Sequence, residues 1–219
     1  LEDSIAAMET LQSSLSDNGD KEAASQVVTA ARSRLNMLDA GVSIIEESLM
    51  ATEAFLKARS GWNAVINADA AIREATALAE EMSKENILAS QAKGNEALAF
   101  LEEAQQDFSQ AEAAYPGLDL AAFEAYVAKR MESQQAALAA DEAYLSRNKE
   151  ELEAQNSRYN ALEEEAAALA QELGEDDPEQ IVALRFYKEI EADQSAYEAE
   201  RLKAGNADAF LREYLGTAS

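Results

Sequence analysis

Large apolar residues recur in steps of three and four through the first part of the chain. This stripe comprises Val28, Ala31, Leu35, Leu38, Val42, Ile45, Leu49, Thr52 and Leu56. Gly41 lies in its middle without shifting its phase, although a glycine in a helix interior costs about 1 kcal/mol relative to alanine. Losing the phase would expose several large side chains at about 1.5–3 kcal/mol each. The pattern therefore predicts one helix from about Lys21 to Arg59, packed along this stripe against other helices, and a break at Gly41 is the alternative.

Further stripes with the same spacing follow along the chain. They comprise Val65, Ala68, Ile72, Ala75, Ala79, Met82, Asn86 and Ala89; then Ala97, Leu101, Ala104, Phe108, Ala111 and Tyr115; then Leu120, Phe123, Val127, Met131, Leu138 and Leu145; then Leu152, Gln155, Tyr159, Leu162, Ala166, Leu169 and Leu173; and finally Ile181, Leu184, Tyr187, Ile190 and Tyr197. Each stripe predicts a helix that buries this face in the core of the protein. Runs of β-branched residues with a period of two are absent from the sequence, so strands are not expected.

Turn-forming residues separate the predicted helices. They lie at Asp17–Asp20, Ser60-Gly61, Gly94-Asn95, Pro116-Gly117, Ser146–Asn148, Gly174 and Gly205-Asn206. Asp20, Asp119 and Asn148 are placed to cap the helices that follow them, and Asp177 precedes a proline at the first position of another helix. One helix from Asp119 to Leu173 is the alternative to a turn at Ser146–Asn148, since this stretch contains neither Gly nor Pro.

Together these elements predict an all-α fold. We expect an antiparallel multi-helix bundle of six to eight long helices with coiled-coil-like packing, because short turns place consecutive helices side by side. The bundle would be a single elongated domain over residues 1–219, with a subdivision near residues 116–118 as the alternative.

The charge of the chain narrows the choice of partners. With 43 acidic and 18 basic residues, the net charge is −25, which repels phosphate backbones and anionic lipid surfaces. Nucleic-acid binding is therefore not expected. The charge fits solubility, and its alternative interpretation is a docking surface for a basic partner.

Several kinds of chemistry lack their usual residues. The chain has no Cys and no His, which removes thiolate catalysis, Ser–His pairs and the common zinc sites. Asp17, Asn18, Asp20 and Glu22 resemble a calcium loop, but its closing position holds Val28, so a turn with a helix cap explains them better. The acidic clusters at 163–165 and 176–177 are expected on solvated faces. We therefore expect no catalytic residue, no metal and no cofactor.

Polar residues beside the stripes are the best candidates for a binding site. Asn63 and Asn67 are four residues apart next to Trp62, and Asn156 and Asn160 are four apart around Tyr159. Gln155 and Asn86 occupy stripe positions themselves. Buried polar residues commonly fix helix register. The functional interpretation is a polar, aromatic-lined cleft that recognises a ligand or partner, formed by Trp62, Asn63, Asn67, Asn156, Tyr159 and Asn160.

Two stretches resemble known families. The segment AEAAYPGLDLAAFEAY at residues 111–126 is similar to the helix joints of tetratricopeptide-like proteins. Asn156 to Asn160, followed by the Asp177-Pro178 cap and a Tyr-bearing helix, resembles helical ectodomains of uncharacterised Gram-positive surface lipoproteins. This second resemblance implies attachment at the cell surface. The lipidated Cys of such proteins is not in this chain, whose first residue, Leu1, fits removal of an N-terminal signal or anchor segment.

The sequence thus favours a non-enzymatic, extracytoplasmic helical scaffold or binding domain. It would present helix faces, or a cleft between helices, to a protein or cell-envelope partner. The alternatives are a small-molecule-binding helical protein and an intracellular coiled-coil adaptor. No apolar run approaches the ~20 residues of a membrane span, so no transmembrane segment is expected in this chain.

Overall fold

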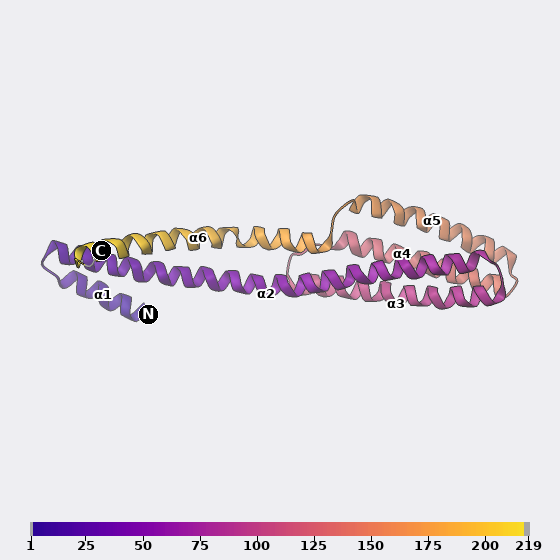
Figure 1. Cartoon of the computed structure of the whole chain (residues 1–219), viewed down its shortest axis with the longest axis horizontal. Helices are drawn as coiled ribbons and strands as arrows, with labels where there is room; N and C mark the ends of the chain where they lie inside the picture. Colours follow the sequence, from indigo (N-terminus) through magenta and orange to yellow (C-terminus); the bar gives the residue numbers. More distant parts are fainter. Residues whose placement is uncertain (1, 217–219) are drawn as a thin grey trace. The chain divides into compact units, whose positions relative to one another are not determined.

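The computed structural model describes residues 2–216, which form helices and turns without a strand (Figure 1). The helices are α1 (Glu2–Ser14), α2 (Asn18–Glu80), α3 (Lys84–Ala114), α4 (Ala121–Leu145), α5 (Lys149–Leu173) and α6 (Pro178–Tyr214). The all-α prediction is confirmed. However, α1 has 13 residues and only the other five helices are long, so the predicted count of six to eight long helices is too high. The count fails because three predicted turns lie inside helices.

The chain divides into two compact units. The first unit comprises Leu1–Leu49 and Phe186–Ser219, and the second comprises Met50–Arg185. The turn at residues 116–118 lies inside the second unit. The expectation of a single domain over residues 1–219 stays a prediction.

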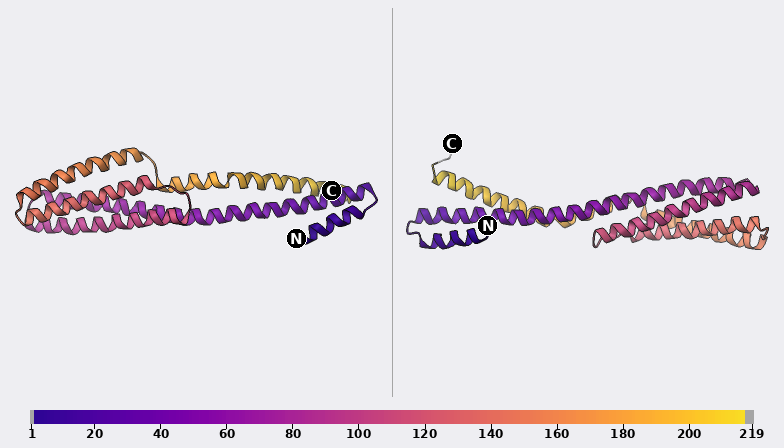
Figure 2. Two further views of the ribbon diagram at one scale, coloured as in Figure 1. Left: turned by 180° about the vertical axis from the view of Figure 1, so that it is seen from behind. Right: turned by 90° about the horizontal axis from the view of Figure 1, so that it is seen from below.

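The second unit is a bundle of the second half of α2 with α3, α4 and α5, which run side by side in Figure 2. The stripe predicted on α3 forms its core: Ala97, Leu101, Ala104, Phe108, Ala111 and Tyr115 are each at most 1% exposed. Phe108 meets Phe123 of α4 with a ring-centroid separation of 5.8 Å. For this helix, the spacing of apolar residues correctly predicted the buried face.

α2 buries a seam of mostly small residues instead of its large ones. The buried positions Ala30, Ser33, Ala40, Ala51, Ala54, Ala58, Gly61, Val65, Ala68, Ile72 and Ala75 keep one heptad phase. The helix continues through Gly41, as predicted, but also through Ser60-Gly61, so the predicted stop at Gly61 is wrong. A Cβ at Gly61 would lie 2.8 Å from the Phe108 ring and 3.2 Å from the Ala104 carbonyl oxygen. This glycine therefore permits close contact with α3 and does not end the helix.

Two further glycines that the sequence predicts as helix ends lie inside helices, so these two predictions are wrong. Gly94 lies within α3, where a Cβ would come 2.5 Å from Gln134 Nε2 and 2.8 Å from a methyl group of Leu138. Gly205 lies within α6, which continues to Tyr214. The actual end of α2 was not predicted. It lies at residues 81–83, where Ser83 caps α3 by accepting a hydrogen bond from the Asn86 amide.

The remaining turns follow from local chemistry. α3 ends before Pro116-Gly117, with Gly117 at φ +80°, and α5 ends at Gly174, with φ +61°. The Asn148 side chain accepts from the Glu151 amide and starts α5, which confirms the turn at 146–148. The Asp177 side chain likewise accepts from the Glu179 amide at the start of α6.

Two predicted caps need correction. At the start of α2, Asp17 and not Asp20 accepts the amide hydrogen bonds, from Gly19 and Asp20 itself. At the start of α4, the N-cap position is Leu120, and Asp119 accepts only from the Ala121 amide. The predicted cap of α2 is three residues too late, and the N-cap of α4 lies one residue after the predicted Asp119. Sequence patterns locate a helix end only to within a few residues.

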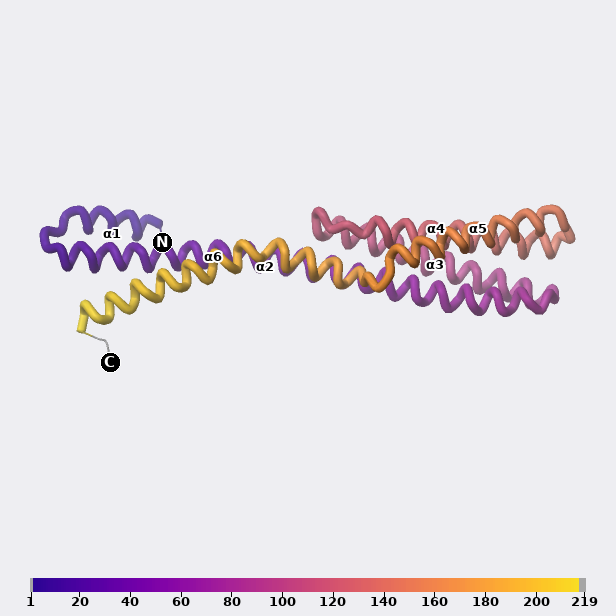
Figure 3. The backbone as a smooth tube through the Cα atoms, turned by 90° about the horizontal axis from the view of Figure 1, so that it is seen from above, coloured from indigo at the N-terminus to yellow at the C-terminus, as the bar shows by residue number. Residues whose placement is uncertain are grey.

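The first unit combines α1, the first half of α2 and most of α6. α1 folds back along the start of α2 in Figure 3, where Arg32 pairs with Glu9. The Ser43 hydroxyl donates to Asp193 of α6 at 2.5 Å, and the Tyr214 hydroxyl donates to Asp20 at 2.5 Å. Polar contacts therefore link α6 to both the beginning and the later part of this half of α2.

Candidate functional site

The most conspicuous surface feature is the very stripe that the sequence predicted as core. Leu38, Val42, Ile45 and Leu49 are 53–67% exposed, and Leu56 is exposed as well. Of the predicted stripe, Val28 is buried. The prediction that these large residues face other helices of the chain is therefore wrong. We call Leu38, Val42, Ile45 and Leu49, all in the first unit, the α2 stripe.

The α2 stripe is exposed because α2 packs through its opposite face. Ala40 and Ile44 follow Leu38 and Val42 by two residues, which is about 200° around the helix. The helix can bury only one of these faces against α6. Small side chains allow the closer approach of two backbones, and Ala40 is buried accordingly. α6 likewise buries only one of its apolar faces: Val182 and Ile190 are buried, whereas Leu184 and Tyr187 are exposed.

A row of acidic side chains borders the α2 stripe. Asp39 and Glu46 are seven residues apart, exposed, and without an ion pair among residues 2–216. Glu53 continues their spacing beyond the first unit. No basic residue occurs between Arg34 and Lys57. The surface thus joins a heptad-phased apolar strip to uncompensated negative charge.

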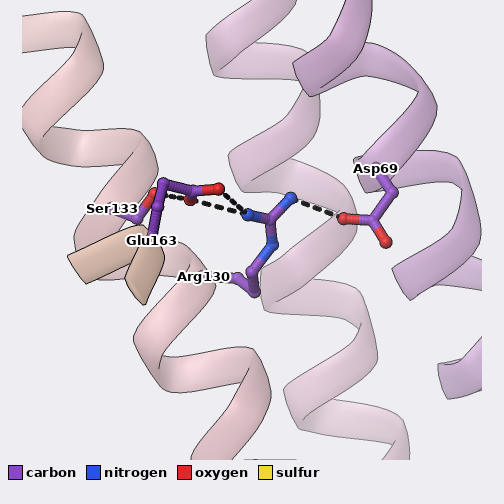
Figure 4. A network of polar contacts seen from close by, with 4 residues as sticks. All are labelled: Asp69, Arg130, Ser133 and Glu163. Atoms are coloured by element: carbon purple, nitrogen blue, oxygen red, sulfur yellow. Dashed lines mark hydrogen bonds and ion pairs between the residues drawn. The ribbon is translucent and has the colours of Figure 1, made fainter. Parts of the chain in front are cut away.

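A second feature is a network of charges inside the second unit (Figure 4). Arg130 of α4 reaches Asp69 of α2 at 2.7 Å and the two carboxylate oxygens of Glu163 of α5 at 2.6 and 2.8 Å. The Ser133 hydroxyl also donates to Glu163. One side chain thereby connects three helices of the bundle.

The carboxylates around Arg130 keep its guanidinium charged at neutral pH. Burial by itself lowers the pKa of Arg130, but the charges of Glu163 and Asp69 outweigh it, so the pKa is raised. Burial, followed by the charge of Asp69, raises the pKa of Tyr126 beside the network. Burial, followed by the charge of Glu163, raises the pKa of Tyr159, although a hydrogen bond with Thr76 lowers it in part. Arg130 is therefore a cation that links three helices through ion pairs, and both tyrosines stay protonated at neutral pH.

An open cleft of about 230 Å³ borders this network. Its lining consists of Asp69, Arg73, Tyr126, Arg130, Glu163, Ala166, Ala167 and Ala170. The Nε of Arg130 is buried there without a hydrogen-bond partner. However, the cleft is smaller than the usual 300–1,000 Å³ of a ligand pocket, and its carboxylates already accept hydrogen bonds. The geometry suits helix registration better than ligand capture.

The predicted site residues lie in two separate places. Trp62 is half-buried and meets Phe123 edge-on at 5.5 Å, while Asn63 and Asn67 are exposed on α2. Tyr159 is half-buried against Thr76, and Asn156 and Asn160 are exposed on α5. Because Thr76 lies 14 residues beyond Trp62 on one helix, the two neighbourhoods are about 21 Å apart. The structure does not bring them together in one cleft.

Sequence reasoning missed Arg130, although a signal was present. The buried positions Leu120, Phe123 and Val127 continue in phase to Arg130 and Gln134, not to the predicted Met131. Following this heptad spacing strictly along the sequence would therefore have predicted that Arg130 and Gln134 are buried. Further along, the same phase reaches Asp141, which is buried and accepts a hydrogen bond from Ser90 at 2.8 Å. Glu163 was expected on a solvated face, and its role in the network was not foreseen.

The described residues contain no cluster of three or more acidic side chains that could hold a metal ion. None of the helices within residues 2–216 combines the length and apolar character needed to cross a membrane. No protein-family model matches the chain, and no curated protein or solved structure compared with it does so either.

Proposed function

We propose that this chain is a helical binding scaffold whose α2 stripe docks an amphipathic helix of a protein partner. The observation that carries the proposal is the exposure of four large apolar residues in unbroken heptad phase beside an acidic row. A heptad-phased strip of this kind is the face that helices use to pair with one another. Contiguous exposed apolar residues mark interaction surfaces more often than isolated ones do.

The α2 stripe offers enough apolar surface for specific binding. Full burial of a Leu, Ile or Val side chain is worth about 1.5–3 kcal/mol. The four residues are already partly covered, so docking would yield on the order of 1–2 kcal/mol for each of them. Their sum suits a reversible complex, once the entropic cost of association is subtracted.

The charges favour a basic partner over a second copy. In an antiparallel pair of α2 stripes, Asp39 and Glu46 would face the same acidic row. In a parallel pair they would face Gly41 and Ser48, which carry no charge to balance them. A partner helix with Lys or Arg beside its apolar residues compensates the row, and the net charge of −25 would speed its approach.

A synthetic heptad peptide with Leu in its core positions and Lys beside them tests this proposal by fluorescence anisotropy. We expect saturable binding that the double variant Ile45→Gln/Leu49→Gln weakens at least about tenfold. The matched control is Leu202→Gln, which removes an equally exposed leucine from α6 and should leave binding unchanged. A peptide with Glu in place of Lys should bind far more weakly.

Three results would refute the proposal. The stripe variant could bind the Lys peptide as well as the original chain does. The Glu peptide could bind equally well, which would remove the argument from charge. Sedimentation could instead reveal a dimer that Ile45→Gln dissociates, which would make a second copy the occupant.

The absence of an enzymatic role and the extracytoplasmic location remain parts of the proposal. The location rests on the resemblance to Gram-positive surface lipoproteins alone. The full-length gene tests it directly: a secretion signal with a lipidation site upstream of Leu1 supports surface attachment. An upstream sequence without either would favour the intracellular adaptor.

A further inference from the structure

A basic pocket occurs in this strongly acidic chain, at the turns that precede α3 and α5. It is open, has a volume of about 530 Å³, and is lined by Lys84, Ala143, Tyr144, Leu145, Arg147, Asn148, Lys149 and Leu152. Three of the 18 basic residues of the chain line it, and none of the 43 acidic residues does. All of these lining residues belong to the second unit, so a ligand here would bind independently of the α2 stripe.

The three cations of the pocket have no carboxylate partner. Lys84, Arg147 and Lys149 are exposed and form no ion pair among residues 2–216. Most other basic side chains behave differently: Lys93 and Lys129, for example, each contact two carboxylates. Positive charge in this pocket is therefore available to a ligand.

The nearby carboxylates lie outside the lining of the pocket. Glu81 accepts a hydrogen bond from the Asn86 side chain, and Glu151 accepts one from Gln155 at 2.7 Å. Glu85 and Glu150 directly follow Lys84 and Lys149 in the sequence, but neither lines the pocket. An anion inside the pocket would meet cations and apolar side chains first.

The turns that frame the pocket are tied together and strained. The Tyr144 hydroxyl donates to the Met82 carbonyl, which joins the two turns. Met82 at φ +47° and Arg147 at φ +61° are the non-glycine residues with positive φ among residues 2–216. Such conformations are energetically unfavourable for residues other than glycine, and they cluster at active sites and ligand-binding positions.

We infer that this pocket binds a small organic phosphate or similar dianion that carries an apolar group. Arg147 and the two lysines supply the donors and charge that a phosphate oxygen requires. Leu145 and Leu152 supply an apolar wall, and Tyr144 adds an amphipathic ring. Inorganic phosphate would use only the first set of contacts, whereas an aryl phosphate would use both.

Phenyl phosphate, inorganic phosphate and benzyl alcohol separate the two contributions in titrations followed by NMR chemical shifts. We expect phenyl phosphate to bind about tenfold more tightly than inorganic phosphate, and benzyl alcohol not to bind. Binding should weaken as salt rises, since exposed charges are screened. The shifted signals should come from Lys84, Tyr144 and Arg147.

Charge-matched variants make the test specific. Lys84→Gln and Arg147→Gln should each weaken phenyl phosphate binding at least about threefold, since each removes one contact. Lys188→Gln removes the same charge from an exposed position on α6 and should leave binding unchanged. Circular dichroism would verify that all variants fold. Absence of saturable binding would overturn the inference, as would an equal loss in Lys188→Gln or equal binding of benzyl alcohol.

Discussion

Gly61 offers a direct test of how α2 packs. The Gly61→Ala substitution adds one methyl group to a helix interior, which by propensity alone should stabilise the chain by about 1 kcal/mol. The added Cβ would lie 2.8 and 2.9 Å from two atoms of the Phe108 ring and 3.2 Å from the Ala104 carbonyl oxygen. Phe108 is completely buried and contacts the Phe123 ring, so a shift of its ring would disturb the core around it.

The packing cost should exceed the propensity gain. Overfilling a tight core costs about 1–3 kcal/mol. We therefore expect Gly61→Ala to lower the free energy of unfolding by about 1 kcal/mol in total. Gly41→Ala, on the same helix with no other atom within 4 Å of the added Cβ, should raise it by up to about 1 kcal/mol.

Urea unfolding followed by circular dichroism at 222 nm measures both effects through the midpoint and slope of the transition. A Phe108→Leu background checks the cause, because a smaller side chain relieves the contact. In that background Gly61→Ala should no longer destabilise. If Gly61→Ala stabilises the original chain as much as Gly41→Ala does, the close contact between α2 and α3 is refuted.

Three further predictions concern polar groups of the second unit. Arg130→Met should lower the free energy of unfolding by about 2 kcal/mol, because two partly buried carboxylates lose their counter-ion. Urea unfolding measures this loss, and an unchanged free energy would show that the network does not stabilise the fold. Burial raises the pKa of Asp141 above its usual 3.8, so its carboxyl binds a proton more readily in the folded chain. Its contribution to stability is therefore full below pH 3.8 and is lost as pH rises through the raised pKa. Asp141→Asn should accordingly be more stable than the original chain at pH 7 but not near pH 3, and an equal difference at both pH values would contradict this. Asn148→Ala should cost about 1 kcal/mol through loss of the α5 cap, with exposed Asn63→Ala as the control.

Local chemistry made part of this structure predictable. Pro116-Gly117, Asn148, Gly174 and Asp177 act through constraints within a few residues, namely a fixed φ, a positive φ or a side-chain cap. Each ends or starts a helix where the sequence predicted. The α3 stripe was predictable for a related reason: Leu101, Phe108 and Tyr115 recur every seven residues, and the alanines between them keep the same phase.

Glycines inside helices show where that reasoning stops. Gly61 and Gly94 look like helix ends in the sequence, yet each makes room for a side chain of a neighbouring helix. A glycine can serve either purpose, and the choice depends on atoms that lie far away in sequence. The residues of the candidate cleft are separated for a similar reason. Trp62 packs against Phe123, whereas Tyr159 lies beside Thr76, about four turns further along α2.

The sequence by itself determined the helical class, the capped turns and the heptad spacing, because these depend on backbone conformation and on residues within one or two turns. Only the tertiary structure decided which heptad face of α2 is buried. Its small-residue face permits close backbone packing, so it lies inside, and the four large residues of the α2 stripe remain on the surface. The same limit applies to Arg130 and to the basic pocket, whose residues come from separate helices or turns and acquire their meaning through contact in space.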